Sequence, residues 1–158
     1  MLIHLIRHAH AGSRKAWKGD DSERPLSDRG RAQAQAIARE LDDTGVDTLW
    51  SSHFVRCAQT LEPLARRLSL AVETVPELGE GGDGPAALDA LLAAAARGRT
   101  VAASSHGDVV PAIVAAAVER GATLDGPTAA KKGARYELTL QDGSIARVVH
   151  VEAFDARR

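Results

Sequence analysis

The first few residues of this chain limit its possible folds more than any other stretch. Residues 2–6 form a short run that is apolar except at His4, and Arg7 and His8 follow it directly. Such a run is typical of a buried parallel strand. Because ligands of open α/β sheets bind at the carboxyl ends of the strands, polar side chains just after this strand are well placed for chemistry. The start of the chain therefore predicts an α/β fold with Arg7 and His8 in its functional site.

The rest of the sequence alternates between predicted strands and predicted helices. Short apolar runs indicate further strands, which we expect over residues 46–50, 71–75 and 100–104. Apolar residues at helical spacing indicate helices, which we expect from Ser27 to Gly45 and over residues 54–68, 85–97 and 109–118. Residues 134–140 and 145–151 predict a β-hairpin. This order predicts a single domain, residues 1–158, with three α/β/α layers, a mainly parallel central sheet and a C-terminal β-hairpin.

Composition excludes several classes of protein. The 20 Lys and Arg residues nearly cancel the 21 Asp and Glu residues, so a net charge of -1 gives no electrostatic reason to bind nucleic acid or an acidic membrane surface. Aromatic residues make up only 3% of the chain, too few for a nucleic-acid stacking surface. One cysteine, Cys57, fits a reducing cytoplasm, and no apolar segment has the length of a signal peptide or membrane span. We expect a soluble cytoplasmic protein without nucleic-acid or membrane partners.

Cationic and imidazole side chains recur where the predicted strands end. Arg56 begins the helix after the second strand, and His106 follows the fourth. Arginines hold phosphate through paired hydrogen bonds, and the helix N-terminus at Arg56 also favours an anion. A neutral histidine such as His8 acts as a nucleophile when nearby cations stabilise charge on the phosphoryl oxygens. With a carboxylic acid from the glycine-rich loop 76–84, these residues predict phosphoryl transfer through His8.

Other kinds of site fit the sequence less well. A cysteine phosphatase loop needs an arginine six positions after Cys57, where this chain has Pro63. The sequence contains no G-x-x-x-x-G-K-[ST] phosphate loop and no G-x-S-x-G turn. His8 and His10 could share one face of a strand and bind a metal ion, although the sequence clusters no further ligands near them. A metal hydrolase stays open as an alternative, while we expect no metal and no cofactor.

Residues 12–24 form a polar stretch that predicts either a solvated loop or a loop facing the substrate. Its polar side chains are candidates to bind further phosphate groups: Ser13, Arg14, Lys15 and Lys18. A second group of cations could join them: Lys131, Lys132 and Arg135. This combination favours a multiply phosphorylated compound or a nucleotide as substrate.

Four motifs, in this order, resemble those of the histidine phosphatase superfamily, also called phosphoglycerate-mutase-like. They are Leu5-Ile6-Arg7-His8, Pro25-Leu26-Ser27 with Gly30 and Gln33-Ala34, Ser51-Ser52 with Arg56 and Gln59-Thr60, and Ser105-His106-Gly107. The small size is similar to SixA-type phosphohistidine phosphatases. Three further stretches look like the phosphatase-like domain fused to Nudix hydrolases in actinobacteria: residues 17–21, Arg56-Cys57 with residues 61–64, and Lys132-Gly133-Ala134 before a strand.

The resemblance implies a role for each matching residue. His8 would be the phosphorylated nucleophile, and three side chains would line the phosphate pocket: Arg7, Arg56 and His106. The proton donor would be Glu80, which fits the L-x-E pattern of the family, although Glu77 lies in a Pro-Glu-Leu that SixA-type chains also show. Arg14 stands where many sugar-phosphate members carry asparagine, which argues against a phosphoglycerate mutase.

The predicted function is that of a metal-independent phosphatase. It would hydrolyse a phosphomonoester or a phosphohistidine through a covalent phospho-His8 intermediate. Its substrate would be a phosphorylated small molecule, a nucleotide or a phosphohistidine protein. Two alternatives are a non-catalytic module that binds a phosphorylated ligand or nucleotide, and a nucleotide-directed phosphohydrolase.

Overall fold

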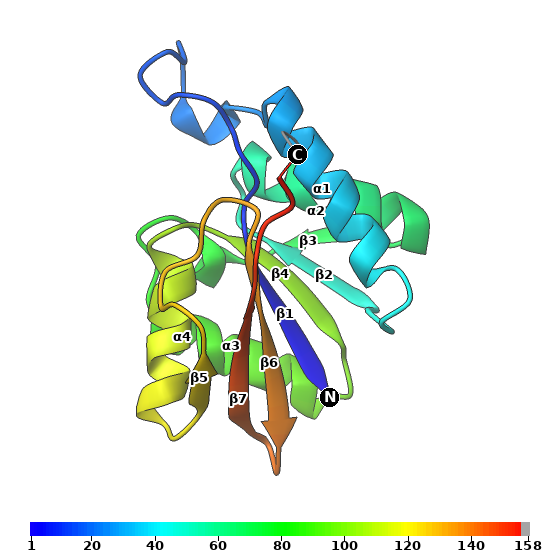
Figure 1. The fold of residues 1–158 in the computed structure, drawn as a ribbon, viewed down its shortest axis with the longest axis vertical. Coiled ribbons are helices and arrows are strands. Elements are labelled where there is room, and N and C mark those ends of the chain that lie inside the picture. Colours follow the sequence, from blue (N-terminus) through cyan, green and yellow to red (C-terminus); the bar gives the residue numbers. More distant parts are fainter. Residues whose placement is uncertain (156–158) are drawn as a thin grey trace.

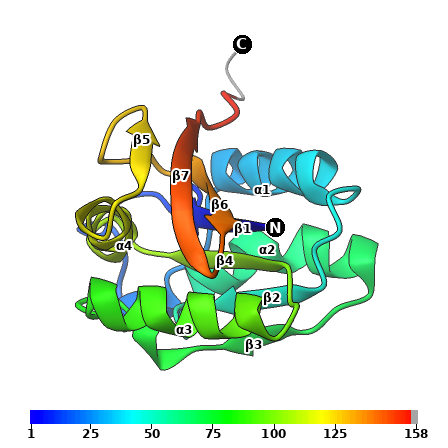
Figure 2. The ribbon, with the colours of Figure 1, turned by 90° about the horizontal axis from the view of Figure 1, so that it is seen from below.

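A seven-stranded sheet runs through the centre of the protein, with helices on both of its faces (Figures 1 and 2). The structure is a computed structural model that describes residues 1–155. Its strands are β1 (Leu2–Arg7), β2 (Thr48–Ser51), β3 (Val72–Thr74), β4 (Val101–Ser105), β5 (Thr123–Asp125), β6 (Arg135–Gln141) and β7 (Ser144–Val151). Its α-helices are α1 (Asp28–Leu41), α2 (Val55–Leu68), α3 (Gly84–Ala96) and α4 (Val109–Glu119), and two 3-10 turns span Asp21–Glu23 and Pro76–Leu78.

The strand order places β1 in the middle of the sheet. The order is β3-β2-β4-β1-β6-β7-β5, with parallel pairing from β3 to β1 and antiparallel pairing of β1 with β6 and of β6 with β7. The predicted α/β/α class, the mainly parallel sheet and the C-terminal hairpin are confirmed. Strand β5, which pairs with β7, was not predicted, because its three residues include a single apolar side chain.

Alternation along β1 explains the three layers. Ile3 and Leu5 pack into the core formed with α3 and α4, whereas Ile6 packs into the core formed with α1 and α2. Successive side chains of a strand point to opposite faces, so a strand with apolar residues on both faces must lie between two layers of helices.

Helix boundaries differ slightly from the expected ones. Ser27 caps α1 as predicted, since its side chain accepts a hydrogen bond from the Gly30 amide. The helix ends at Leu41 with Asp42 as its C-cap, and Gly45, with φ of 81°, lies in the turn that follows. Pro63 is accommodated inside α2, which continues to Leu68. Within residues 1–155, no helix has the length and apolar character needed to cross a membrane.

Candidate active site

A cavity of about 460 Å³ opens at the carboxyl ends of β1 and β4, where α2 begins. Figure 1 shows the segment between β1 and α1 rising past this edge of the sheet. The residues that line the cavity come from five parts of the chain: Arg7, His8, Gly12, Arg14, Arg24, Arg56, Glu80, His106, Gly107, Asp108 and Lys132. The structure therefore brings together the Arg7–His8 pair, Arg56, His106 and Glu80, which the sequence places far apart.

His8 is held as a neutral imidazole with a defined tautomer. Its Nδ1 lies 2.8 Å from the Ala9 carbonyl oxygen, which only accepts hydrogen bonds, so Nδ1 carries the proton. The lone pair is then on Nε2. Burial is the main cause that lowers the pKa of His8 to about 3; the hydrogen bond to Ala9 opposes this shift, and the charge of Arg56 adds to it. The backbone is also fixed, because the His8 amide donates to the Ser105 carbonyl at 2.9 Å. These features are those that a histidine nucleophile requires.

His106 lies beside His8, with 5.6 Å between the ring centroids. Burial lowers its pKa to about 4, with Arg56 as the next cause, so this ring is also neutral near pH 7. Its Nε2 lies 2.9 Å from the hydroxyl oxygen of Ser52, which also accepts a hydrogen bond from the Phe54 amide. A serine hydroxyl that donates to Nε2 leaves the proton of the ring on Nδ1.

Arg56 is the most deeply buried cation of the cavity, with 1% of its surface exposed. Its guanidinium donates to the Asp21 carbonyl at 2.8 Å and to the Asp21 carboxylate at 3.1 Å, and it lies 3.5 Å from Glu80. It also packs over the Phe54 ring, 4.8 Å from the centroid. The paired donors of this guanidinium are thereby fixed in one orientation, as bidentate phosphate binding needs.

Asp21 fixes three arginines of the cavity at once. Its carboxylate lies 3.0 Å from Arg24, 3.1 Å from Arg56 and 3.3 Å from Arg14. Burial alone would raise the pKa of Asp21, but the hydrogen bond from Arg24 and the charge of Arg56 hold it below the usual value. The sequence analysis did not assign Asp21 or Arg24 a role, and the arginine directly before the Pro25-Leu26-Ser27 motif was the available signal.

Arg7 reaches the cavity through a space that only glycine leaves open. A Cβ atom at Gly107 would lie 2.7 Å from the Arg7 guanidinium carbon. The Arg7 Nη1 donates to the Ala130 carbonyl at 2.8 Å, which orients the group. Gly107, which the sequence analysis used only as part of a motif, lines the cavity, and so does Lys132, one of the three further cations that the sequence offered.

The two candidate acids occupy different places. Glu80 lines the cavity and accepts a hydrogen bond of 2.7 Å from Arg14, whereas Glu77 is exposed on the 3-10 turn and is not part of the cavity lining. The loop that carries Glu80 is anchored by Asp108, whose carboxylate accepts from the Gly81 amide at 2.8 Å.

The predicted phosphate-binding loop contributes less than expected. Arg14 lines the cavity, but Ser13, Lys15 and Lys18 are exposed and are not among its lining residues. Arg135 is buried at the start of β6, where it lies 3.0 Å from Glu40 and 3.6 Å from Glu137. Its charge is thus neutralised away from the cavity.

His10 faces a separate hollow from His8. Its Nδ1 lies 2.6 Å from the Ser27 hydroxyl, and it lines a smaller space with Arg7 and Gln33 among others. Among residues 1–155, no three His, Cys, Asp or Glu side chains are grouped so that they could hold a metal ion. Cys57 is fully buried, and burial raises its pKa to about 12, which does not favour a thiolate nucleophile.

Three polar side chains from the quoted motifs hold the loops around the cavity. The Gln33 side chain accepts from the His10 amide at 2.8 Å and donates to the Lys132 carbonyl at 3.2 Å. The Gln59 side chain accepts from the Leu26 amide at 2.8 Å, and the Thr60 hydroxyl accepts from the Ala9 amide at 3.0 Å. Buried backbone amides need such partners, which explains these residue types at these positions.

Buried neutral histidines predict that the protein loses stability in mild acid. The pKa values of His8 and His106 are lower in the folded chain than the usual 6.5, so the unfolded chain binds more protons as pH falls below about 6.5. Each of these two histidines should therefore lower the unfolding free energy by about 2 kcal/mol when the pH falls from 7.5 to 5. Urea unfolding at both pH values measures this difference.

His4 provides a second test of this prediction. It is buried, burial lowers its pKa, and neither ring nitrogen has a hydrogen-bond partner among the described residues. His4→Leu should make the dependence on pH shallower without touching the cavity. If the unfolding free energy depended on pH equally in this variant and the wild type, His4 would not be a buried neutral histidine. Equal stability of the wild type at pH 7.5 and 5 would contradict the same assignment for His8 and His106.

Comparisons with known proteins identify the family of this chain. Residues 3–87 match the model of the histidine phosphatase superfamily (branch 1). The chain is 38% identical over 144 residues to the 8-oxo-(d)GTP phosphatase of Mycolicibacterium smegmatis, which covers 89% of this chain and 45% of that protein. The chain therefore spans less than half the length of this relative.

Solved structures show the same architecture. The protein histidine phosphatase SixA, in complex with tungstate, is 26% identical, with a TM-score of 0.76 and coverage of 98% of this chain and 97% of that one. A mycobacterial glucosyl-3-phosphoglycerate phosphatase, 15% identical with a TM-score of 0.72 and coverage of 97% and 99%, shares the fold. The chain belongs to the histidine phosphatase superfamily, and it is SixA-like in sequence and fold.

Proposed function

We propose that the protein is a metal-independent phosphatase that works through a phosphorylated His8. The observation that carries this proposal is the neutral His8 ring, with its Nδ1 proton committed to the Ala9 carbonyl, in one cavity with Arg7 and Arg56. A fixed lone pair beside two cations suits attack on a phosphoryl group whose oxygens gain charge in the transition state.

The proposed reaction has two steps. The Nε2 atom of His8 attacks phosphorus and the bond from phosphorus to the leaving oxygen breaks. Glu80, which takes up a proton when the bound substrate releases it from Arg56, gives that proton to the leaving oxygen. Glu80 then takes a proton from water, the water oxygen bonds to phosphorus, and the bond from phosphorus to nitrogen breaks. Inorganic phosphate leaves and His8 is neutral again. Arg7, Arg56 and His106 would donate hydrogen bonds to the phosphoryl oxygens throughout.

The resting contacts of Glu80 fit this cycle. Its carboxylate lies 2.7 Å from Arg14 and 3.5 Å from Arg56. A phosphate that enters the cavity competes for Arg56, because it offers the same paired oxygens with more charge. Binding of substrate would thus free Glu80 from Arg56 for proton transfer.

The names of two relatives support a phosphorylated compound as the substrate. The Mycolicibacterium smegmatis relative acts on 8-oxo-(d)GTP by its name, and SixA is a protein histidine phosphatase that was solved with tungstate, a tetrahedral oxyanion like phosphate. We propose a phosphomonoester, a nucleotide or a phosphohistidine protein as substrate of this chain.

Turnover of an aryl phosphate in excess chelator tests the proposal. We expect activity that resists the chelator, and a phosphoenzyme after brief incubation with labelled substrate that survives base and is lost in acid, as phosphohistidine is. Activity lost with the chelator would favour a metal hydrolase. Tungstate binding without turnover of any phosphorylated substrate would instead favour a non-catalytic binding module.

A comparison of two conservative variants identifies the proton donor. Glu80→Gln should lower kcat for an ester with a poor leaving group about 100-fold, because protonation of the leaving oxygen is lost. Glu77→Gln should change kcat less than about two-fold, since Glu77 is exposed outside the cavity lining. The reverse result, with Glu77→Gln as the impaired variant, would move the role to Glu77.

A further inference from the structure

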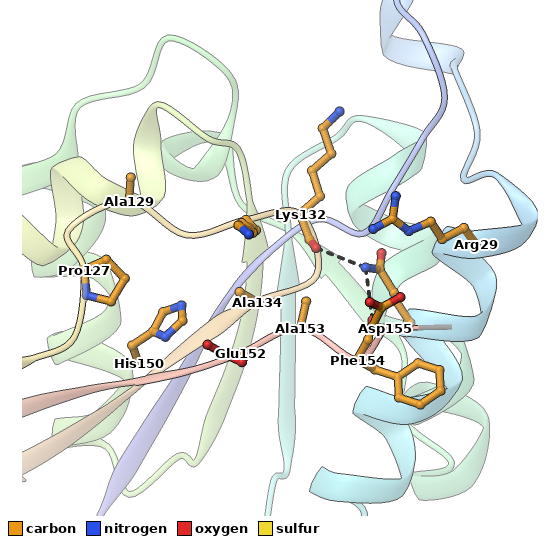
Figure 3. A pocket seen from close by; sticks show the side chains of 12 residues that line it. Arg29, Pro127, Ala129, Lys132, Ala134, His150, Glu152, Ala153, Phe154 and Asp155 are labelled. Atoms are coloured by element: carbon orange, nitrogen blue, oxygen red, sulfur yellow. Dashed lines mark hydrogen bonds between the residues drawn. The ribbon is translucent and has the colours of Figure 1, made fainter. Parts of the chain in front are cut away.

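A second, larger cavity lies beside the His8 cavity. It has a volume of about 700 Å³ and lies between the start of α1, the segment before β6 and the end of β7 (Figure 3). Pro127, Ala129, Ala153 and Phe154 give it apolar walls, and His150 and Glu152 add polar groups. Phe154 is 43% exposed, which leaves ring surface available for a ligand. Nothing in the proposed reaction uses this space.

A smaller groove of about 280 Å³ shares lining residues with both cavities. Lys132 lines both cavities and the groove, Arg7 lines the groove and the His8 cavity, and Arg29 and Lys131 line the groove and the larger cavity. The three spaces therefore form one continuous surface, from the phosphate pocket at His8 to the apolar walls near Phe154.

The groove gathers four cations that form no ion pair with a described carboxylate, although Glu152 and Asp155 line the larger cavity and the charge of Asp108 acts on Arg7. Among residues 1–155, no Asp or Glu oxygen lies within 4.0 Å of a side-chain nitrogen of Arg7, Arg29, Lys131 or Lys132. Within the same described residues, the Nε atoms of Arg7 and Arg29 are buried without a hydrogen-bond partner. Burial lowers the pKa of Lys132, and so do the nearby cations, with Arg7 the strongest of them. An anion in the groove would relieve this repulsion.

The segment that carries the two lysines is fixed to the catalytic strand. The Gly133 amide lies 3.1 Å from both the Arg7 and His8 carbonyl oxygens, and the Arg7 amide donates to the Ala134 carbonyl at 3.0 Å. Gly133 has φ of 84°, and a Cβ atom there would lie 2.9 Å from the Gln33 side chain. Gln33 also donates to the Lys132 and Phe154 carbonyls, as the dashed lines in Figure 3 mark. The groove thus has a rigid position relative to His8.

We propose that the groove and the larger cavity bind the leaving group of the substrate, and that this leaving group is itself an organic phosphate. The preferred substrates are then organic diphosphates and triphosphates, such as nucleoside diphosphates, whose terminal phosphoryl group reaches His8. The next phosphate lies between Arg29, Lys131 and Lys132, and the organic part lies against Phe154. This inference rests on the proposed function, since it concerns the same reaction.

The bond changes follow the two steps already given. Nε2 of His8 attacks the terminal phosphorus, and the bond to the bridging oxygen breaks. The bridging oxygen, once protonated, leaves as part of an organic phosphate that is one phosphate shorter. Water then releases inorganic phosphate from His8, so that one water is consumed for each product pair.

The test compares adenosine diphosphate with an aryl phosphate, which has no second anionic group. The variant Arg29→Ala/Lys131→Ala should lower kcat/KM for the diphosphate roughly 10- to 100-fold, mainly through KM, because two charge-assisted contacts are lost. Aryl phosphate turnover should change less than about two-fold. The matched control Arg31→Ala/Arg39→Ala removes two exposed arginines of the same helix and should leave both substrates unaffected. Equal losses on both substrates, or no loss on the diphosphate, would overturn the proposal.

Binding to a variant without the nucleophile separates the two proposals. Adenosine diphosphate should bind His8→Ala, measured by calorimetry, and Arg29→Ala/Lys131→Ala in that background should weaken binding at least about 10-fold. If the wild type hydrolyses no substrate but this weakening is found, the subsite stands and the phosphatase proposal falls. If the diphosphate binds equally to both variants or to neither, the subsite falls whatever the activity.

Discussion

His8→Ala is expected to abolish turnover of an aryl phosphate, with kcat at least about 1,000-fold below that of the wild type. The variant removes the only atom that forms the proposed covalent bond to phosphorus. It should still fold, because the ring makes one hydrogen bond, to the Ala9 carbonyl, and the backbone bond to Ser105 stays. Initial rates, the unfolding temperature and the absence of an acid-labile phosphoenzyme would be measured together.

His10→Ala is the matched control for this variant. It removes a neighbouring imidazole that contacts Ser27 and faces another hollow, so the loss of activity should be at most about 10-fold. A metal hydrolase with both histidines as ligands would instead lose activity to a similar extent in the two variants. A phosphoenzyme formed by His8→Ala would refute His8 as the nucleophile.

The second large effect is expected for Arg56→Lys, which should lower kcat/KM about 100- to 1,000-fold while the positive charge is kept. Lysine has no planar pair of donors, so it cannot hold two phosphoryl oxygens and the Asp21 carboxylate in the observed geometry. The cavity would keep a cation at position 56, but the fixed orientation of its hydrogen-bond donors would be lost. Steady-state kinetics and the affinity for tungstate would both be measured.

Arg66→Lys on the same helix is the matched control. Arg66 is exposed outside the His8 cavity, so its replacement should leave kinetics and tungstate affinity within about two-fold of the wild type. Comparable activity of Arg56→Lys and the wild type would show that charge alone suffices, and would contradict bidentate binding at Arg56.

Much of the fold could be predicted because it depends on local patterns. The apolar run before Arg7 and the Ser27 cap determine structure within a few residues of themselves, and both are where the sequence indicates. Gly45 was assigned wrongly as the end of the first helix, because Asp42 can already cap it and the glycine serves the next turn. Strand β5 depends on pairing with β7, which no local pattern reveals.

The site was predictable only where a residue follows a strand or belongs to a motif. Asp21 is 35 residues from Arg56, and its contact arises because the loop after β1 folds back over α2. The sequence offered Lys131, Lys132 and Arg135 equally as phosphate-binding cations. Of these three, Lys132 alone lines the His8 cavity, because residues 130–134 are bonded to Arg7. Such long-range contacts decide which of many surface cations serve the site, and spacing in the sequence does not encode them.

The central position of β1 also determines how the site responds to local opening of the molecule. Three strands lie on each side of β1, and the residues around the nucleophile are bonded to both neighbours, to Ser105 on one side and to Gly133 and Ala134 on the other. Fluctuations that open a sheet begin at its edges, here β3 and β5, where only one neighbour must be released. A molecule in which the β5 edge opens therefore still holds Arg7 and His8 between their neighbours, whereas opening of β3 also reaches Glu80 in the loop that follows it.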